Sequence, residues 1–293
     1  MKATWFVCFL LCGAVLAETP REMTEPFFKG GEKSVEMKIH EKVYKTTPQG
    51  ELTLRIYEPA VGGKNRPCAV FFFGGGWKGG SSLQFGKHCE FLASHGYVAI
   101  TPKYRTERGH GTTPRESVMD AKSCIRWIRA HADELGIDSD RLVVGGGSAG
   151  GHLAAATATV TEINDPADDL LVSCVPNCLV LFNPVVNNGP GEDAYGYDRV
   201  ADYWKDFSPM HNVDGKKMPP TVIFLGTTDR IIPVSVGEGF VSRVRKTGAE
   251  AKLFLYEEQG HGFFNYNDGE NPFFFESLCD MAGFLKENGY LSD

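Results

Sequence analysis

Residues 141–152 read RLVVGGGSAGGH, and this stretch decides the fold. An apolar run over 142–144 leads into three glycines, a serine and then small residues typical of a closely packed helix. Positions 146–150 have the form G-x-S-x-G, which predicts a sharp strand-to-helix turn that exposes Ser148 above the end of a buried strand. Glycines flank the serine because side chains there would collide with neighbouring backbone. The stretch therefore predicts a nucleophilic serine on an α/β scaffold.

A serine hydroxyl is a weak nucleophile unless a base accepts its proton and an acid orients that base. On a scaffold of this kind these two groups follow later strands, and the acid comes first. Asp229 closely follows an apolar run at 222–225, and His261 closely follows another at 253–256. This order predicts that Ser148, Asp229 and His261 form a catalytic triad. Taken separately, the aspartate could be a turn residue and the histidine an exposed loop residue.

Other residues compete for the same roles. His152 lies one helical turn after Ser148, where packing or capping is its simpler role. The rival acids Asp202 and Asp206 lie in an irregular stretch and not at the end of a strand. The positions of Asp229 and His261 after predicted strands therefore favour them as acid and base.

Short continuous apolar runs recur along the chain after a hairpin pattern near its start. Continuous hydrophobicity indicates strands that are covered on both faces, as in a parallel sheet. Helical patterns lie between them, and this alternation predicts right-handed crossovers in a three-layer α/β domain with a mostly parallel sheet of about eight strands. The predicted strands are 35–44, 52–57, 69–73, 98–100, 142–144, 179–182, 222–225 and 253–256, and the predicted helices are about 83–95, 115–135, 149–160, 234–247 and 273–288.

The stretch 186–215 breaks the alternation. It is rich in Asn, Gly, Asp and aromatic residues, and we expect it to form an insertion over one edge of the sheet. No internal repeat and no linker divides the chain into two domains, so the sequence predicts one catalytic domain over 18–293.

A second glycine-rich turn follows the predicted strand 69–73 and reads FGGGWKGGS over 73–81. Ester hydrolysis places negative charge on a carbonyl oxygen, and backbone N–H groups stabilise that charge where glycine allows a close approach. We predict that Gly75, Gly76 and Ala149 supply these N–H groups as an oxyanion hole. A purely structural tight turn is the alternative.

Both glycine turns also contain the letters G-x-G-x-x-G, which occur in dinucleotide-binding folds. For the turn at 145–150, the acidic residue expected about 20 residues later would fall within 165–169, which does not end a predicted strand. Neither turn contains the G-K-[ST] of a phosphate-binding loop. We therefore do not expect a nucleotide site, and the chemistry predicted for the serine needs no metal or organic cofactor.

Four motifs together resemble the α/β-hydrolase superfamily, over about 38–288. They are FGGGW at 73–77, GGSAG at 146–150, GTTD at 226–229 and GHGFF at 260–264. Within that superfamily the chain looks like the esterases and lipases that carry an HGGGW-type loop, and most like carbohydrate esterases of the acetylxylan-esterase and feruloyl-esterase kind. The resemblance implies the α/β-hydrolase fold and a serine carboxylesterase.

The family usually has a histidine before the three glycines, where this chain has Phe73. That histidine is associated with holding the loop and not with proton transfer, so the resemblance still implies hydrolysis, with different hydrogen bonds around the oxyanion loop. The substrates that the resemblance implies are small-molecule or glycan esters, above all acetyl or other short acyl groups on polysaccharides and their fragments. Trp77, Tyr203 and Trp204 are candidates for stacking on sugar rings, although packing in the core is the alternative for each.

Two other functions remain open. A serine exopeptidase would use the same triad, although such peptidases usually carry a large second domain. A non-catalytic binding protein would keep the scaffold, although it would normally have lost one member of the triad.

The N-terminal residues 1–17 predict a secretory signal peptide. Lys2 precedes an apolar run over 3–16, and Val15 and Ala17 have the small side chains that signal peptidase prefers. A membrane anchor is the alternative, but the run is shorter than the roughly 20 residues that span a bilayer. We expect a secreted or periplasmic protein that is not inserted in the membrane after cleavage.

The composition is that of an ordinary globular protein, with 42% hydrophobic and 23% charged residues and a net charge of −7. This excludes a disordered chain, and the acidic balance argues against a nucleic-acid partner. Six of the eight cysteines lie after the predicted signal, and none has the spacing of a zinc site, nor does any pair clearly predict a disulfide. The oligomeric state is left open.

Overall fold

The computed structural model describes residues 22, 24 and 36–291. The predicted signal peptide at 1–17 lies outside the described residues. Where the structure is described, no helix is both long enough and apolar enough to cross a membrane.

An eight-stranded sheet forms the centre of the molecule, in the spatial order β1-β2-β4-β3-β5-β6-β7-β8. The first two strands form an antiparallel hairpin, and β2 pairs antiparallel with β4. All pairs from β4 onwards are parallel. The strands are β1 (Met37–Thr47), β2 (Gly50–Pro59), β3 (Arg66–Phe72), β4 (Val98–Pro102), β5 (Ile137–Gly147), β6 (Cys178–Phe182), β7 (Thr221–Gly226) and β8 (Ala251–Tyr256).

Burial follows the hydrophobic pattern that predicts these strands. Every residue of β4, β6 and β7 is buried, because helices cover both faces of the sheet there. The strand β8 lies at one edge and is partly exposed, and the residues of β1 at the other edge are exposed or half-buried, except for the buried Tyr44. The prediction of a mostly parallel α/β sheet of about eight strands is confirmed.

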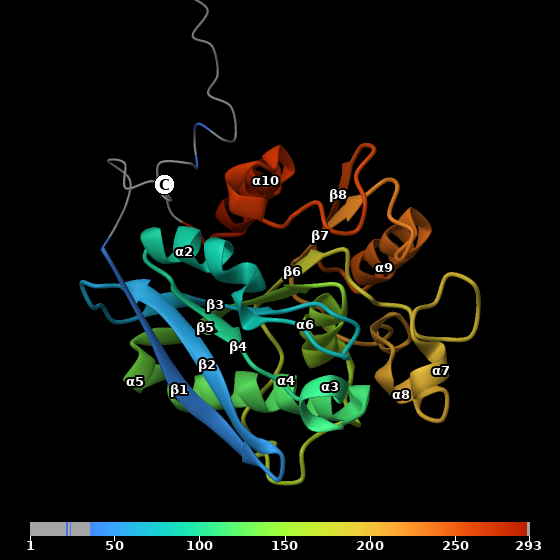
Figure 1. The fold of residues 1–293 in the computed structure, drawn as a ribbon, viewed down its shortest axis with the longest axis horizontal. Helices are drawn as coiled ribbons and strands as arrows, with labels where there is room; N and C mark the ends of the chain where they lie inside the picture. The colour runs from blue at the N-terminus through green and yellow to red at the C-terminus, as the bar shows by residue number, and fades with distance from the viewer. Residues whose placement is uncertain (1–21, 23, 25–35, 292–293) are drawn as a thin grey trace, which may run out of the picture.

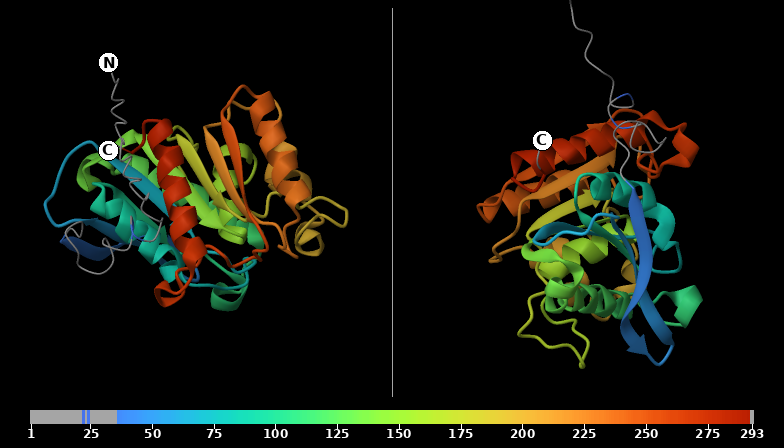
Figure 2. Two further views of the ribbon diagram at one scale, coloured as in Figure 1. Left: turned by 90° about the horizontal axis from the view of Figure 1, so that it is seen from above. Right: turned by 90° about the vertical axis from the view of Figure 1, so that its left-hand side faces the viewer.

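Helices cover the two faces of the sheet, as Figures 1 and 2 show. One face packs against α2 (Gly86–Ser94) and α10 (Pro272–Glu287), with η2 (Ser82–Phe85) before the first of them. The other face packs against α4 (Pro114–Ala130), α5 (Ala132–Leu135), α6 (Ala149–Thr159) and α9 (Val234–Lys246). These helices match the five that the sequence predicts, apart from breaks before α2 and α5.

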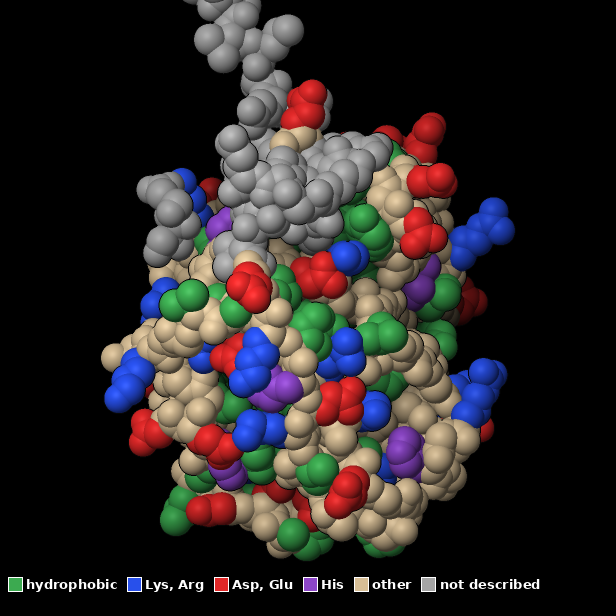
Figure 3. Space-filling view, turned by 60° about the vertical axis from the view of Figure 1, so that its left-hand side comes forward, with side chains coloured by type: hydrophobic (Ala, Val, Ile, Leu, Met, Phe, Trp, Pro, Cys, Tyr) green, Lys and Arg blue, Asp and Glu red, His purple; other side chains and the backbone are tan. Residues whose placement is uncertain are grey.

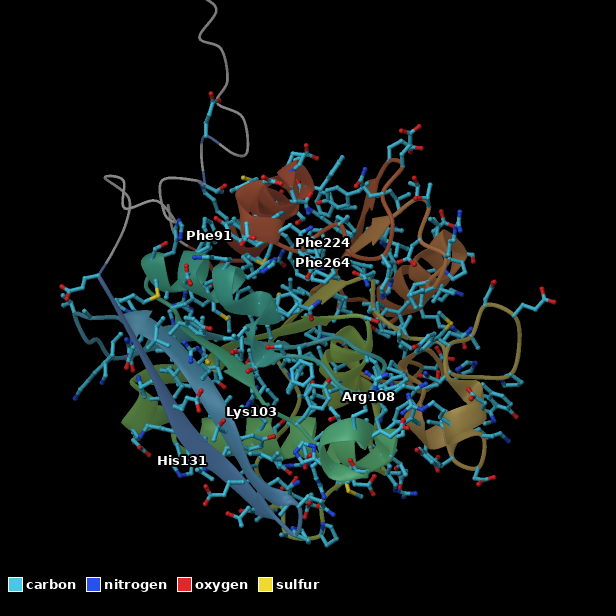
Figure 4. All side chains as sticks on the ribbon, in the orientation of Figure 1. Phe91, Lys103, Arg108, His131, Phe224 and Phe264 are labelled. Carbon is cyan, nitrogen blue, oxygen red and sulfur yellow. The ribbon has the colours of Figure 1, made fainter. Side chains whose placement is uncertain are left out.

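The α2–α10 face carries a layer of aromatic side chains. Phe91, Phe224 and Phe264, which Figure 4 labels, belong to this layer. Phe85 stacks on Phe264 with ring centroids 5.4 Å apart, and His88 packs among these rings. Phe264 itself lies in the loop after β8, and a Cβ on Gly147, at the end of β5, would meet the rings of Phe264 and Phe85, so the layer packs against both of these segments.

The stretch 186–215 forms short helical turns, as expected of an insertion. These are α7 (Tyr197–Val200), α8 (Trp204–Phe207) and η3 (Pro209–Asn212), which lie at one end of the molecule in Figure 1. The sequence patterns did not predict two further short elements, α3 (Glu107–His110) and η4 (Asn267–Gly269).

The surface and the cysteines agree with the composition. Figure 3 shows basic and acidic side chains interspersed across the face that it presents. The six cysteines of the described residues are free, and five of them are buried. Among the described residues, no group of His, Cys, Asp and Glu could hold a metal ion.

Candidate active site

Ser148 occupies the sharp turn between β5 and α6, where the G-x-S-x-G pattern places it. Its backbone has φ 54° and ψ −120°, a conformation that side chains rarely adopt and that costs roughly 1–3 kcal/mol. Neighbouring strands hold the turn, since the Ser148 N–H donates to the carbonyl of Phe182 at 3.0 Å. Gly150 is required because a Cβ there would lie 2.0 Å from the carbonyl oxygen of Phe72. The turn is therefore strained and also enclosed by backbone.

Ser148 opens into a cavity of about 450 Å³ at the carboxyl ends of the parallel strands. This is where open α/β sheets usually bind ligands. The cavity brings together residues from both glycine turns, from η2, from the loops after β6, β7 and β8, and from the insertion. They are Gly74, Gly75, Gly76, Gly80, Ser81, Gln84, Ser148, Asn183, Tyr195, Ile231, His261, Gly262, Phe264 and Asn265.

Asp229 and His261 meet beside this cavity. Asp229 Oδ2 lies 2.7 Å from His261 Nδ1, and the carboxylate is buried while the imidazole is partly exposed. Burial alone would raise the pKa of Asp229, but hydrogen bonds from His261 and from the N–H groups of Ile231 and Ile232 outweigh it and hold that pKa below its ordinary value. The carboxylate is therefore ionised and fixed, so that it can orient the imidazole.

His261 and Ser148 line the same cavity, and no hydrogen bond joins their side chains among the described residues. Such contacts are often long in unliganded enzymes and tighten when substrate binds. Asn183, at the end of β6, contacts the imidazole instead: its Nδ2 lies 3.0 Å from both ring nitrogens. An amide at equal distance from the two nitrogens rests on the ring and limits its movement.

In the described part of the chain no hydrogen-bond acceptor is found for the backbone N–H groups of Gly75, Gly76 and Ala149, the residues that the sequence predicts for the oxyanion hole. Gly75 and Gly76 line the cavity together with Ser148, and Ala149 directly follows the serine. The loop lies very close to the serine, since a Cβ on Gly74 would come within 3.2 Å of Ser148 Cβ. Unpaired donors beside a serine can stabilise an oxyanion.

Three side chains hold the loop that carries Phe73 in place of the family's histidine. The buried Tyr104 hydroxyl donates to the carbonyl of Phe73 at 2.7 Å, and the two rings stack with centroids 4.1 Å apart. Gln84 Oε1 accepts from the N–H of Gly74 at 2.7 Å. Arg199, from α7 in the insertion, donates to the carbonyl of Gly76. The loop is thus held from the segment that follows β4, from η2 and from the insertion.

The three aromatic residues predicted to stack on sugar rings do not line this cavity. Trp77 is fully buried, and its ring packs edge-on against His152 and Phe207 in the core. Tyr203 packs on the ring of Phe207, and Trp204 packs on that of His211. The prediction is wrong for Trp77, and it does not hold at this cavity for Tyr203 and Trp204, because the insertion turns their rings towards its own core.

The rival base His152 is unsuited to proton transfer with Ser148. Its ring is fully buried, its Nε2 lies 3.1 Å from the carbonyl of Phe207, and burial lowers its pKa to about 3. The rival acids Asp202 and Asp206 do not line the cavity.

Five polar residues of the cavity were not predicted as site residues: Ser81, Gln84, Asn183, Tyr195 and Asn265. Of these residues, only Asn183 could have been predicted from the sequence, because it directly follows a strand of the parallel sheet. The tyrosine comes from the insertion, and its hydroxyl would lie 2.8 Å from a Cβ on Gly76. Their roles depend on contacts between distant segments.

Two family models match the chain in succession. The model described as BD-FAE matches residues 54–177, and that of the prolyl oligopeptidase family matches residues 177–276. The first match includes Ser148, and the second includes Asp229 and His261.

Several of the curated relatives that match are named as esterases, and another is an acylamino-acid-releasing enzyme of Arabidopsis thaliana. Esterase LipC of Mycobacterium tuberculosis is 29% identical over 221 residues, which are 68% of this chain and 54% of the relative. Acetylxylan esterase of Xylanibacter ruminicola is 27% identical over 232 residues, which are 73% of this chain and 44% of the relative. The chain thus spans about half the length of the curated relatives it matches.

A solved structure matches over nearly its whole length. Thermogutta terrifontis esterase 2 phosphorylated by paraoxon is 38% identical, with a TM-score of 0.81 over 87% of this chain and 96% of that one. Its propionate-bound structure is 37% identical, with a TM-score of 0.81 over 90% and 98% of the two chains. With this identity over nearly all of both chains, and with the sheet and serine turn described above, the protein belongs to the α/β-hydrolase family of esterases.

Proposed function

We propose that this protein is a serine carboxylesterase in which Ser148 is the nucleophile, His261 the general base and Asp229 the orienting acid. The observation that carries the proposal is the 2.7 Å contact of the Asp229 carboxylate with the His261 imidazole beside the cavity into which Ser148 opens. Aspartate on Nδ1 leaves Nε2 to accept the serine proton and stabilises the imidazolium that results.

The reaction proceeds in two halves. Ser148 Oγ attacks the ester carbonyl while its proton moves to His261, and the oxyanion is held by the N–H groups of Gly75, Gly76 and Ala149. His261 then donates the proton to the departing alcohol, which leaves an acyl group on the serine. Water, deprotonated by the same imidazole, attacks the acyl-enzyme and releases the carboxylic acid.

We expect short acyl groups to be preferred. The cavity volume of about 450 Å³ is shared between the acyl group and the alcohol, and the side chains of Phe264 and Ile231 provide apolar surface. The similarity to structures of esterase 2 bound to propionate and to butyrate supports the same preference. We expect faster turnover of p-nitrophenyl acetate and butyrate than of the decanoate.

Within this class we propose acetylated polysaccharides or oligosaccharides as the natural substrates. The support is the similarity to an acetylxylan esterase and the match to the BD-FAE model. Release of acetate from acetylated xylan, compared with other acetylated glycans and with feruloyl esters, tests this step. Turnover of p-nitrophenyl acetate without release of acetate from any glycan would support the esterase assignment and contradict the proposal that polysaccharides are the substrates.

The decisive experiment is parallel hydrolysis of p-nitrophenyl acetate and of amino-acid p-nitroanilides, with labelling by a fluorophosphonate. We expect ester turnover and labelling at Ser148, both of which are lost in Ser148→Ala. Turnover of the anilides would favour an exopeptidase, in line with the prolyl oligopeptidase match. The absence of turnover on both substrates would favour a binding protein, and labelling of the intact protein elsewhere than at Ser148 would contradict the assignment.

A further inference from the structure

Two loops that must act together come from distant parts of the chain, and two side-chain amides join them across the cavity. Gln84 Oε1 accepts from the N–H of Gly74 at 2.7 Å, and Gln84 Nε2 donates to Asn265 Oδ1 at 3.1 Å. Asn265 Nδ2 in turn donates to the carbonyl of Gly262 at 3.0 Å. The chain of hydrogen bonds thus runs from the oxyanion loop to the residue after His261.

Each amide in this chain has only one orientation that satisfies its partners. A backbone N–H needs an acceptor, so the oxygen of Gln84 must face Gly74 and its nitrogen must face Asn265. A backbone carbonyl can only accept, so the nitrogen of Asn265, and not its oxygen, must face the carbonyl of Gly262. The two side chains therefore connect as donor and acceptor without conflict.

Both amides are held at their bases. Gln84 lies in η2, where its N–H donates to the carbonyl of Ser81 at 3.1 Å, and the next residue, Phe85, is buried in the aromatic layer. The N–H of Asn265 donates to Gly262 at 3.1 Å, and its carbonyl accepts from Asn271 Nδ2 at 2.8 Å. A bridge with anchored ends can transmit position from one loop to the other.

We propose that Gln84 is a positioning residue, which through Asn265 sets the distance between the oxyanion donors and the catalytic base. This inference rests on the proposed function. Gly74 precedes the donors Gly75 and Gly76, so the bond from Gln84 aims the peptide groups of the hole. Phe73 offers no side-chain hydrogen bond at the position where the family's histidine holds the loop, and Gln84 supplies one from η2.

A bridge that aims donors at an oxyanion acts on the transition state more than on the bound ester. Its loss should therefore lower kcat and leave KM nearly unchanged. Deleting an oxyanion donor outright costs about 10²–10³-fold in kcat. Because the donors remain and only their orientation changes, we expect kcat to fall by about 10- to 100-fold.

Gln84→Met tests this, because it removes both hydrogen bonds and keeps a side chain of similar volume. The measurements are kcat and KM for p-nitrophenyl acetate, the inhibition constant of an alkyl trifluoromethyl ketone, and the melting temperature. The ketone forms a hemiketal whose oxyanion needs the hole. Its inhibition constant should rise by the same factor by which kcat falls. Gln49→Met, an exposed glutamine outside the cavity, is the matched control and should resemble the wild type.

Two further variants separate the two ends of the bridge. Gln84→Glu keeps an acceptor for Gly74 but places a carboxylate oxygen against Asn265 Oδ1, so kcat should lie between the wild type and Gln84→Met. Asn265→Ala should lower kcat as well. The double variant Gln84→Met with Asn265→Ala should lose less than the product of the two single losses, because both remove one bridge.

The outcomes distinguish this inference from the proposed function. If the wild type hydrolyses the ester, and does so only with Ser148 present, while Gln84→Met keeps wild-type kcat and ketone inhibition, Gln84 is not a positioning residue. A lower melting temperature with an unchanged ketone constant would assign Gln84 a purely structural role and also overturn the inference. If the wild type itself is inactive, the proposed function fails first.

Discussion

The two glycine turns of the site lie at the ends of the neighbouring strands β3 and β5, yet different parts of the protein determine their shapes. At the turn around Ser148, the main chain of another strand leaves no space: a Cβ on Gly150 would lie 2.0 Å from the carbonyl oxygen of Phe72. At the predicted oxyanion loop, a Cβ on Gly75 would lie 1.9 Å from the carbonyl oxygen of Gly79 in the same loop, whereas the nearest atoms to a Cβ on Gly76 belong to the Tyr195 side chain. The main chain of a neighbouring strand therefore encloses the first turn, and the second is closed by its own main chain and held by remote side chains.

This comparison has a chemical meaning. In the proposed mechanism the nucleophile must stay in one strained conformation, and a rigid backbone enclosure can maintain it. The proposed oxyanion donors must match a substrate, and the side chains around them can be exchanged to change their orientation without loss of the fold. We expect variants at the first turn to abolish catalysis or folding, and variants around the second to tune activity.

Ser148→Ala should have the largest effect. If the precedent of subtilisin transfers, kcat for p-nitrophenyl acetate falls about 10⁶-fold, because the acyl-enzyme cannot form. Single-turnover and steady-state assays would measure it, with the exposed Ser173→Ala as a control that keeps wild-type activity. A Ser148→Ala protein that retained more than a few per cent of the rate would contradict the nucleophile assignment.

Gly150→Ala should have the next largest effect, because it should destabilise the fold. The added methyl group meets the backbone oxygens of Phe72 and Phe73, which cannot move without displacing β3, so we expect a loss of about 3 kcal/mol or more in unfolding free energy. Denaturant titration would measure it. The matched control is Gly283→Ala in α10, where a Cβ meets nothing within 4 Å and the helix should gain up to about 1 kcal/mol. Equal stabilities of the two variants would contradict the conclusion that backbone atoms enclose Gly150.

Acidic pH should lower the stability of the fold through two buried histidines. Burial lowers the pKa of His152, in the helix after Ser148, and of His88, in the aromatic layer, to about 3. Between pH 3 and 6.5 the unfolded chain then holds more protons than the folded one, so stability falls as the pH falls, by about 2 kcal/mol per histidine at pH 5.

His88→Leu sharpens this test. Neither ring nitrogen of His88 has a hydrogen-bond partner among the described residues, so the variant loses no such bond. Its unfolding free energy should depend less steeply on pH than that of the wild type. The unfolding free energies would be measured by urea titration between pH 4 and 7. If they depended on pH equally in the variant and the wild type, the buried imidazole of His88 would not contribute to the pH dependence of stability.

Arg199→Met should have the smallest effect. The variant keeps the bulk of the side chain over Trp77 but removes the hydrogen bond to the carbonyl of Gly76 and the 3.1 Å ion pair with Glu107. We expect kcat to fall about 10-fold with little change in melting temperature, since aim is lost and the fold is kept. Arg243→Met, which breaks the exposed pair with Asp214, is the control and should leave kcat unchanged. A large fall in stability without a change in kcat would contradict a role for the insertion in positioning the site.

Much of the protein could be predicted because the signals were local. Continuous apolar runs identify buried parallel strands, and the G-x-S-x-G pattern identifies the turn at Ser148. Asp229 and His261 were predicted from the strands that they follow, and the structure brings them to 2.7 Å from each other. The triad as a catalytic unit and the expected cleavage after Ala17 stay predictions until they are tested.

The sequence by itself determined the α/β sheet and predicted the residues proposed to carry the chemistry, because periodicity and turn patterns are properties of neighbouring positions. Its motifs also carried the resemblance to the family. Only the tertiary structure decided what holds those residues in place. The bridge through Gln84 and Asn265 joins positions 181 residues apart, and Arg199 reaches Gly76 from 123 residues away. A hydrogen bond between two polar side chains leaves no pattern in a single sequence, so these contacts, and the burial of Trp77, emerge only when the chain is folded.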